Sequence, residues 1–337
     1  YLNNLLKGRS ATPRSWLYEG QSDTEVLRKW MAELETIRDT SNGELVYQFE
    51  TSNLKKWGPQ GKVAPIKELM DIVTEGFSRG TSPMPKIFRT MQWQQAKANA
   101  VKRLTRITGY HALTPRSYEA VIDDMSARDT LESNSGWPDF ARRNKPEILE
   151  RAINDARSKE CYKYPAIALF RNYNAKTRIV WMYPMAVNIR KGSFTQPLKQ
   201  AILNSSDQFF NAWRGYEKVK ESITQDYESG LFLSASDFSH TDAHFLKWQM
   251  LEVYDVIKHC FQTKYWSELK DSMLFVNSIP LVIGPDKWIL GDHGVSSGSN
   301  WTNDVETYMD LICEEYFTIL GLVSRPSDAI GDDVKHV

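Results

Sequence analysis

Acidic residues at two places in the chain have the types and spacing of a divalent-metal site. Asp237 follows the short apolar run 231–235, and Asp332 and Asp333 follow Gly331 in a turn-like segment. Carboxylates gathered at a strand end and on a turn repel one another unless a cation neutralises them. Mg²⁺ takes oxygen ligands, and two such ions can activate an attacking oxygen and neutralise a leaving one. The pattern therefore predicts the chemistry of nucleotidyl transfer.

Each of these acids also has a simpler interpretation. Asp242 lies at the expected start of a helix, where a carboxylate can simply favour the helix dipole. Asp237 precedes that helix by several residues, so the same interpretation suits it less. Gly-Asp is a common hairpin turn, and Gly331-Asp332-Asp333 taken alone indicates little. Its significance comes from the other segments of the chain.

A Ser/Gly loop precedes the last long helical segment. It contains Ser297 and Gly298, and Thr302 and Asn303 follow at the expected start of the helix. Backbone N–H groups and hydroxyls in such a loop can hold a phosphate or a sugar. The alternative is a plain loop in which Thr302 caps the helix.

A basic segment separates Glu160 from Asp207, with no acid between them. Aromatic residues alternate with its cations, which favours a phosphate-lined channel over a solvated face. The cations are Lys163, Arg171, Lys176, Arg178, Arg190, Lys191 and Lys199.

His240 and His244 lie one helical turn apart beside Asp242, and a zinc site is one interpretation of this spacing. No third His or Cys follows at a suitable spacing, and solvated histidines at a helix start are the better interpretation. The three cysteines, Cys161, Cys260 and Cys313, are scattered and are interpreted as packing thiols in a reducing compartment.

Helices and strands must position these groups. Apolar spacing predicts helices in the first half, the first of them capped by Ser22, at residues 23–37, 65–77, 92–107, 115–125 and 146–156. Residues 129–143 are expected to be a loop. In the second half, helices are expected from 242 to about 261 and from 302 to about 320, and strands at 167–170, 179–183, 231–235, 275–283 and 288–290. The alternation predicts an α+β fold whose sheet gathers the acids at one edge.

The length and composition indicate a globular protein. The 337 residues suggest about two packed units. A hydrophobic fraction of 41% and a charged fraction of 25% are those of a globular protein, with 42 basic and 42 acidic residues balancing to zero. No apolar run has the length of a membrane span. The start at Tyr1, without an initiator Met, is expected to be internal to a longer protein.

In this order, the segments resemble the viral RNA-dependent RNA polymerases, and most of all those of the picobirnavirus and partitivirus group of double-stranded RNA viruses. The segment Lys176-Thr177-Arg178-Ile179-Val180-Trp181-Met182-Tyr183-Pro184 is similar to a fingers motif of that group. The resemblance implies that Lys176 and Arg178 hold the incoming triphosphate. Four ordered motifs are far more specific than any one of them.

The resemblance also implies roles for the other motifs. Asp237, Asp332 and Asp333 would be catalytic metal ligands, with Asp333 the lesser one. Asp242 would bind the ribose 2′-hydroxyl, and the loop would position template and nucleotide through Ser297, Gly298, Thr302 and Asn303. More loosely, Ser135, Gly136 and Pro138 are similar to a motif that guides the template. Many single-stranded RNA virus polymerases place an Asn where this chain has Glu306, so a ribose role for Asn303 stays open.

The implied fold is a right-hand polymerase with fingers and palm and a helical N-terminal region. The expected domains are residues 1–130 as the N-terminal extension and part of the fingers, 131–230 as fingers, and 231–337 as palm with a fingers insertion at about 262–292. The family continues past the acidic turn with a further strand, a lysine-bearing motif and a thumb. These are expected to be missing here, and the fragment is expected to be inactive alone.

The implied activity is template-directed RNA synthesis from NTPs with two Mg²⁺ ions, for which Mn²⁺ can substitute. Expected partners are an RNA template, the nascent RNA, NTPs and the viral capsid protein, without a membrane segment, in the virion interior or host cytoplasm. Two alternatives stay open, a non-catalytic RNA-binding fragment and a reverse transcriptase-like palm polymerase. Against the second, Ile330 stands where those enzymes carry an aromatic residue. A zinc hydrolase using His240 and His244 is a remote fourth hypothesis.

Overall fold

The computed structural model describes residues 2–9, 20–54, 63–173, 176–323 and 327–337. The chain divides into two compact units that alternate along the sequence. The smaller unit comprises Tyr1–Thr74, Ala168–Val180 and Val282–Trp288, and the larger comprises Glu75–Ile167, Trp181–Leu281 and Ile289–Val337.

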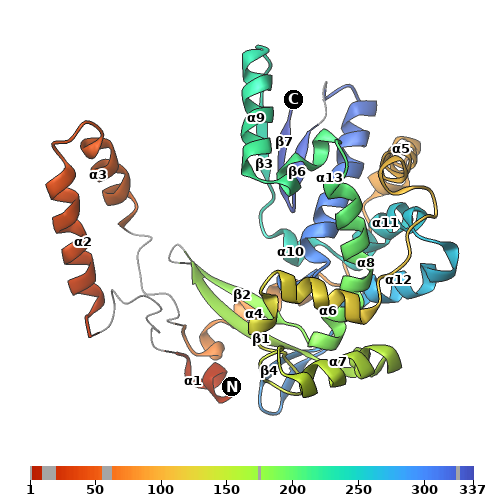
Figure 1. Cartoon of the computed structure of the whole chain (residues 1–337), viewed down its shortest axis with the longest axis horizontal. Coiled ribbons are helices and arrows are strands. Elements are labelled where there is room, and N and C mark those ends of the chain that lie inside the picture. The colour runs from red at the N-terminus through yellow and green to blue at the C-terminus, as the bar shows by residue number, and fades with distance from the viewer. Residues whose placement is uncertain (1, 10–19, 55–62, 174–175, 324–326) are drawn as a thin grey trace. The chain divides into compact units, whose positions relative to one another are not determined.

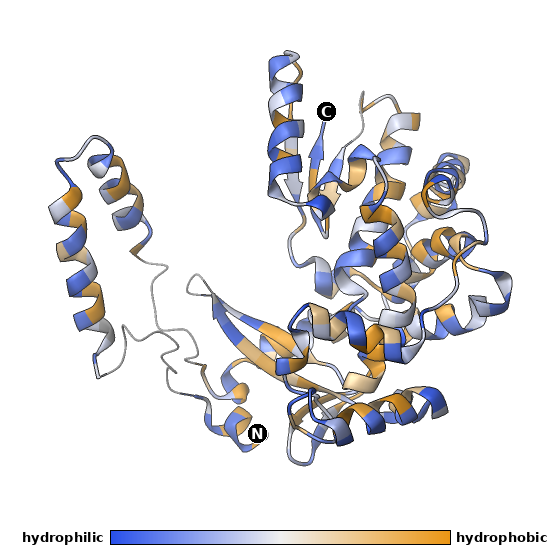
Figure 2. Cartoon of the chain, in the orientation of Figure 1, coloured by the Kyte–Doolittle hydropathy of each residue, from blue (hydrophilic) through white to orange (hydrophobic). Residues whose placement is uncertain are grey.

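Three helices and most of a sheet lie in the smaller unit. The helices are α1 (Leu2–Lys7), α2 (Asp23–Ile37) and α3 (Gly43–Ser52), and α4 (Met70–Ser78) begins in this unit. As the sequence predicted, Ser22 caps α2, and its partner is Glu25 in a reciprocal capping box. Figure 2 shows hydrophobic and hydrophilic residues alternating along α2 and α3. The helix expected at 65–77 is a short 3₁₀ turn, Ile66–Glu68, followed by α4.

The sheet associated with this unit has four strands in the order β2-β1-β4-β5. Their bounds are β1 (Ala166–Tyr173), β2 (Lys176–Met182), β4 (Leu281–Gly284) and β5 (Lys287–Ile289). Two pairs of strands distant in sequence therefore meet along β1 and β4.

Helices dominate the larger unit. They are α5 (Met91–Thr108), α6 (Tyr118–Ala127), α7 (Pro146–Ser158), α8 (Met185–Leu203), α9 (Tyr216–Glu228), α10 (Thr241–His244), α11 (Lys247–Ile257), α12 (Trp266–Leu274) and α13 (Thr302–Ile319). Helix α5 packs against α8, α11 and α13, and α11 also packs against α13 (Figure 1).

The core lies where these helices meet. Along α5, Trp93, Ala96, Ala100 and Leu104 are buried at intervals of three or four residues, which places them on one stripe of the helix. Trp301, just before α13, is completely buried. In Figure 2, the helices of this core carry many hydrophobic residues, whereas α9 is mostly hydrophilic. The core therefore fixes α13 as the rigid support of the segments that precede and follow it.

A second sheet carries the acids. Its strands are β3 (Ser234–Asp237), β7 (Asp333–His336) and β6 (Asp328–Ile330), in the order β3-β7-β6 and antiparallel throughout. In Figure 1, α9 lies beside this sheet, and β6 contacts α13.

Several expected elements differ from the structure. The strand expected at 275–283 is wrong in its first part, because Phe275–Asn277 is a 3₁₀ turn that follows α12 and only Leu281–Gly284 pairs as β4. The helix expected from 242 is broken after α10. At the break, the Phe245 carbonyl accepts hydrogen bonds from Val295 N at 2.9 Å and Asn277 Nδ2 at 3.0 Å. These partners hold the backbone in a non-helical conformation.

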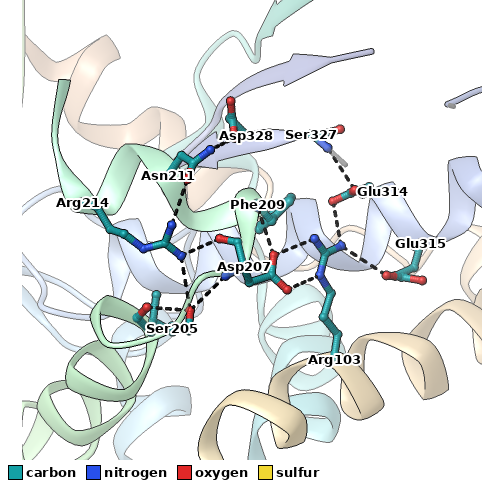
Figure 3. A network of polar contacts seen from close by, with 11 residues as sticks. Arg103, Ser205, Asp207, Phe209, Asn211, Arg214, Glu314, Glu315, Ser327 and Asp328 are labelled. Atoms are coloured by element: carbon teal, nitrogen blue, oxygen red, sulfur yellow. Dashed lines mark hydrogen bonds and ion pairs between the residues drawn. The ribbon is translucent and has the colours of Figure 1, made fainter. Parts of the chain in front are cut away.

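A partly buried polar network joins α5 to α13 and to the 3₁₀ segment Gln208–Arg214 (Figure 3). Arg103 of α5 forms a bidentate pair with Asp207, with hydrogen bonds of 2.7 and 2.8 Å. Its other nitrogen, Nη1, contacts Glu314 at 3.3 Å and Glu315 at 3.4 Å. One guanidinium therefore compensates three carboxylates between separate elements.

Among the residues that the structure describes, no helix is both long enough and apolar enough to cross a bilayer.

Candidate active site

The predicted metal-binding acids lie at one end of the three-stranded sheet. Asp237 is the last residue of β3 and Asp333 the first of β7, and the strand register makes them direct partners. Asp332 lies in the turn between β6 and β7, and its carboxylate accepts a 2.7 Å hydrogen bond from Thr241 Oγ1. The hairpin and the end of β3 therefore bring together the three acids that stand far apart in the sequence.

Asp242 contacts the Ser/Gly loop. It lies in the first turn of α10, and the Ser297 hydroxyl donates a hydrogen bond to its carboxylate. The Ser297 carbonyl in turn accepts a 2.8 Å hydrogen bond from Trp181 N. Thr241 is the first residue of α10, after His240.

Gly298 is required by a close backbone approach. Its φ is +117°, and a Cβ built on it would lie 2.2 Å from the carbonyl oxygen of Trp181. A side chain at this position would need both the loop and Trp181 to move. The loop therefore holds its shape by backbone contact with the end of β2.

Gly298→Ala is expected to destabilise the protein more than Gly291→Ala does. Both glycines are exposed and have similar φ values, +117° and +122°, but nothing lies within 4 Å of a Cβ on Gly291. The difference in unfolding free energy, about 1–3 kcal/mol, isolates the contact with Trp181. Urea unfolding of the two variants measures it, and equal losses of stability would contradict the contact.

The first turn of α13 meets the acidic turn. Gly331 N donates a 2.8 Å hydrogen bond to Thr307 Oγ1. A Cβ on Gly331 would lie 2.5 Å from Asn303 Oδ1, so this glycine lets the turn approach the helix. Thr302 begins the helix and donates to the Ser296 carbonyl at 2.8 Å, so it fixes the loop but does not cap the helix.

Two buried acids on α13 lie close to the predicted metal ligands, and the sequence alone indicated no role for either. Burial, an interaction with Asp242 and the charge of Asp332 raise the pKa of Glu306 to about 10. Burial and the charges of Asp332 and Asp333 raise the pKa of Asp310 to about 8. One carboxylate oxygen on each of these two side chains is buried without a hydrogen-bond partner. Their spacing of four residues on one helix face was the signal that could have identified them.

In the part of the chain that the structure describes, no cation pairs with the acids of this site. Burial, then Asp332 and Asp237, raises the pKa of Asp333. None of the ion pairs formed by the described residues includes these three acids, Asp242 or Glu306. Carboxylate oxygens under mutual repulsion fit a hard divalent cation such as Mg²⁺. In the described part of the chain, however, no three Asp, Glu, His or Cys side chains converge closely enough to hold a metal by themselves.

Glu306→Gln is expected to stabilise the metal-free protein at alkaline pH. Because the folded-state pKa of Glu306 is raised to about 10, folding takes up a proton above the ordinary pKa of 4.5. This contribution to stability therefore falls as pH rises between those two values. The amide keeps the shape without the charge, so Glu306→Gln should gain about 1–3 kcal/mol at pH 8.5 and little at pH 4.5.

Urea unfolding in EDTA at these two pH values tests this expectation. Glu228→Gln, on the exposed surface of α9, is the matched control and should change little at either pH. A Glu306→Gln variant less stable than the parent at pH 8.5 would show that the carboxylate is compensated in the fold.

The hairpin that carries Asp332 and Asp333 is held from behind by polar residues. Lys335 of β7 lies 2.9 Å from Asp328, its direct partner on β6, and also pairs with Asp226 of α9. Asp328 accepts further hydrogen bonds from Ser222 Oγ at 2.6 Å and Asn211 Nδ2 at 3.1 Å. These partners place Lys335 in support of the hairpin.

The segment predicted to guide template forms a tight turn against the end of β2. Ser135 is buried, its amide donates to the Ala141 carbonyl at 2.7 Å, and its carbonyl accepts from Met185 N at 2.8 Å. Gly136 has φ +72°, and a Cβ there would lie 2.8 Å from the Tyr183 carbonyl oxygen. Pro138 is exposed. The turn is thus fixed against residues that directly precede α8.

The cations of the basic segment differ in exposure. Lys176 and Arg178 are exposed on β2, in the smaller unit. Arg190 and Lys191 are 3% and 1% exposed, so the expectation that they line a phosphate channel is wrong. Arg190 pairs with Glu268 at 2.7 Å and donates to Tyr118 at 2.9 Å. These partners, distant in sequence, make the two cations part of the packed interior.

The histidines take separate roles. His240 Nδ1 lies 2.7 Å from Glu75, and His244 Nε2 is buried without a hydrogen-bond partner. Burial raises the pKa of each cysteine thiol, to about 11 for Cys161 and about 12 for Cys260 and Cys313. These thiols are therefore unreactive at neutral pH.

The fold is similar to that of a solved right-hand polymerase. Across its full length the chain matches the crystal structure of the RNA-dependent RNA polymerase of a human picobirnavirus with a TM-score of 0.74 and 23% sequence identity. It covers 65% of that structure. The insertion-loop deletion mutant of the same kind of polymerase matches with a TM-score of 0.72 and 23% identity, over 68% of its length.

A curated sequence gives the same relationship. The chain is 26% identical over 362 aligned positions to a potential RNA-dependent RNA polymerase of human picobirnavirus, strain Human/Thailand/Hy005102. The alignment covers 99% of the chain and 64% of that protein, so the chain spans a little under two thirds of its relative's length. No family model matches the chain.

Proposed function

We propose that the protein performs template-directed RNA synthesis by nucleotidyl transfer from NTPs, in viral genome replication and transcription. The observation that carries the proposal is the direct pairing of Asp237 with Asp333 beside Asp332, within a fold shared with a picobirnavirus polymerase. Acids at the end of one strand and on a facing hairpin can hold the two metal ions that nucleotidyl transfer uses.

Asp237 and Asp332 are the main proposed ligands of two Mg²⁺ ions, for which Mn²⁺ can substitute, and Asp333 is the lesser ligand. When bound, the ions would activate the attacking 3′-hydroxyl and neutralise charge on the departing pyrophosphate. The strand pairing fixes the backbone positions of Asp237 and Asp333, and the hydrogen bond from Thr241 orients the Asp332 carboxylate before substrate arrives. Such preorganisation is the larger part of what the protein contributes to phosphoryl chemistry.

Asp242 is the proposed partner of the ribose 2′-hydroxyl. Its contact with the Ser297 hydroxyl supports this role, because both groups can hydrogen-bond to a sugar. Lys176 and Arg178 are the proposed clamp of the triphosphate, and the exposure of both side chains on β2 leaves them accessible to an anion. Gly298, Thr302 and Asn303 shape the loop and helix start beside the acidic turn.

The division into domains is also a proposal. Residues 231–337 form the palm, with a fingers insertion at about 262–292, residues 131–230 form fingers, and residues 1–130 form a helical extension with part of the fingers. Ser135, Gly136 and Pro138 would lie on the template path. RNA template, nascent RNA and NTPs are the proposed ligands, with the capsid protein as a further partner, in the virion interior or host cytoplasm.

A polymerisation assay with the complete protein tests the function. Labelled NMP incorporation should require the NTP complementary to a homopolymeric RNA template, and should stop when EDTA removes the divalent metal. Salt-sensitive RNA binding without incorporation would favour an RNA-binding protein. Preferential use of dNTPs would favour a reverse transcriptase-like enzyme. Either result would overturn the proposal.

A further inference from the structure

A buried lysine lies directly behind the Ser/Gly loop. Lys191 of α8 is 1% exposed, and its Nζ donates a 2.9 Å hydrogen bond to Ser299 Oγ. The same Nζ lies 3.5 Å from the centre of the Tyr183 ring. Among the ion pairs of the described residues, none includes Lys191. A lysine is rarely retained in a protein interior without a carboxylate partner, and a pure packing position would favour an apolar side chain.

Tyr183 continues this contact to the other side of the loop. Its hydroxyl, completely buried, lies 2.9 Å from Ser296 Oγ. Ser296 and Ser299 are the residues on either side of Ser297-Gly298. Burial lowers the pKa of Lys191 well below its ordinary value. Both polar side chains that hold the loop therefore come from one stretch, the end of β2 and the start of α8.

The backbone of α8 adds a third attachment. Asn300 Nδ2 donates a 3.1 Å hydrogen bond to the Asn188 carbonyl. Ser296, Ser299 and Asn300 are thus fixed from behind, while the hydroxyl of Ser297 points to Asp242. The Ser297 hydroxyl can keep one orientation only if the loop backbone on both sides of Ser297 is fixed.

We propose that Lys191, together with Tyr183, is a positioning device for ribose selection. Through Ser299 and Ser296 it fixes the loop so that Ser297 orients the Asp242 carboxylate toward the sugar of the incoming nucleotide. The inference rests on the proposed function and deepens it. Lys191 itself touches no substrate. It sets the discrimination between ribose and 2′-deoxyribose by fixing the two groups that contact the sugar.

Incorporation of a single NTP and of the matching 2′-dNTP by the complete protein gives the test. Lys191→Met removes the donor at similar volume, and Ser299→Ala removes the acceptor, which also accepts a 3.2 Å hydrogen bond from Trp301 N. In each variant the ratio of kcat/KM for NTP to that for 2′-dNTP should fall by about fivefold, the equivalent of one hydrogen bond. Tyr183→Phe should give a smaller fall by releasing Ser296.

Lys199→Met is the matched control, because Lys199 belongs to the same helix and also lies over an aromatic ring, 5.2 Å from the centre of Trp213. Its ratio should stay unchanged. A general loss of kcat for both nucleotides, with their ratio preserved in Lys191→Met and Ser299→Ala, would reduce Lys191 to a structural residue and overturn the inference. If Lys191→Met does not fold, Ser299→Ala and Tyr183→Phe decide the question.

Amide hydrogen exchange separates this inference from the proposed function. Residues 296–303 of Lys191→Met should exchange faster than in the parent chain, whether or not the protein polymerises. Unchanged exchange would overturn the anchoring. A parent protein that makes no RNA would instead overturn the proposed function, and faster exchange in the variant would still support the anchoring.

Discussion

Asp237→Asn and Asp332→Asn are each expected to reduce NMP incorporation by the complete protein by about a thousandfold or more. The change keeps the side-chain shape but removes negative charge where several kcal/mol of transition-state stabilisation by metal ions is expected. Asp333→Asn should cause a smaller loss, because Asp333 is the lesser proposed ligand. Incorporation of one labelled nucleotide on a primed RNA template, with Mg²⁺ in excess, measures all three.

Asp286→Asn, on the exposed turn between β4 and β5, is the control and should retain full activity. Circular dichroism should show the folded state in every variant, because Asp237 is exposed and Asp332 is only half-buried. Retained synthesis in Asp237→Asn or Asp332→Asn would contradict the metal assignment.

Arg103→Met is expected to destabilise the fold by about 3–5 kcal/mol at pH 8. Burial by itself would lower the pKa of Arg103, but the hydrogen bonds to Asp207 and the charges of Glu314 and Glu315 raise it. Without the guanidinium, the Glu314 side chain, 4% exposed, loses its cation (Figure 3). An isolated buried carboxylate must then be ionised at a high free-energy cost or take up a proton.

The pH dependence of that loss follows from the carboxylates. The pKa of Asp207 is lowered in the folded protein, so its contribution to stability is present above its ordinary value of 3.8 and is lost as pH falls. Burial raises the pKa of Glu314 to about 7 even beside Arg103, so in Arg103→Met this carboxyl takes up a proton as pH falls and no longer needs a cation. The difference in stability between parent and Arg103→Met should therefore narrow toward pH 4, and Asp207 should narrow it further below pH 3.8. Urea unfolding at the two pH values measures it. Lys102→Met, its exposed neighbour, should change stability little, and an equal loss in both variants would contradict the network.

The sequence correctly predicted the helices whose signals lie within the helix itself or at its ends. Ser22 and Glu25 form their capping box at the start of α2. The apolar stripe of α5 and the long α13 were likewise predicted within one or two residues. The fold class, α+β with a right-hand polymerase arrangement, was predicted from the order of the motifs and is confirmed by the structural match.

Elements determined by distant partners were missed. Helix α8 buries Asn188, Arg190 and Lys191 among apolar residues on every side, so its sequence shows no apolar stripe. Pro197 within it also argued against a helix. The partners that make this burial possible, Glu268 and Ser299, follow about 80 and 110 positions later. No window of local sequence contains them.

At the candidate site, residue types identified the acids but not their supports. Asp237 and Asp332 stood out because each follows an apolar or turn segment. Glu306 looked like an ordinary helical acid, and only the fold shows it buried beside Asp242. Lys335 likewise acquires its meaning from Asp226, which belongs to a helix that the sequence did not predict.

The position of β3 at the edge of its sheet has a dynamic consequence. This strand of four residues pairs only with β7 within the sheet, and most of its side chains are exposed. Its detachment would therefore break few contacts and leave the helical core intact, which makes it a candidate for local unfolding well below the global free energy. Asp237 is the last residue of that strand. The site can thus lose one of its acids in a transient fluctuation, and any ligand that joins Asp237 to Asp332 would suppress this opening by mass action.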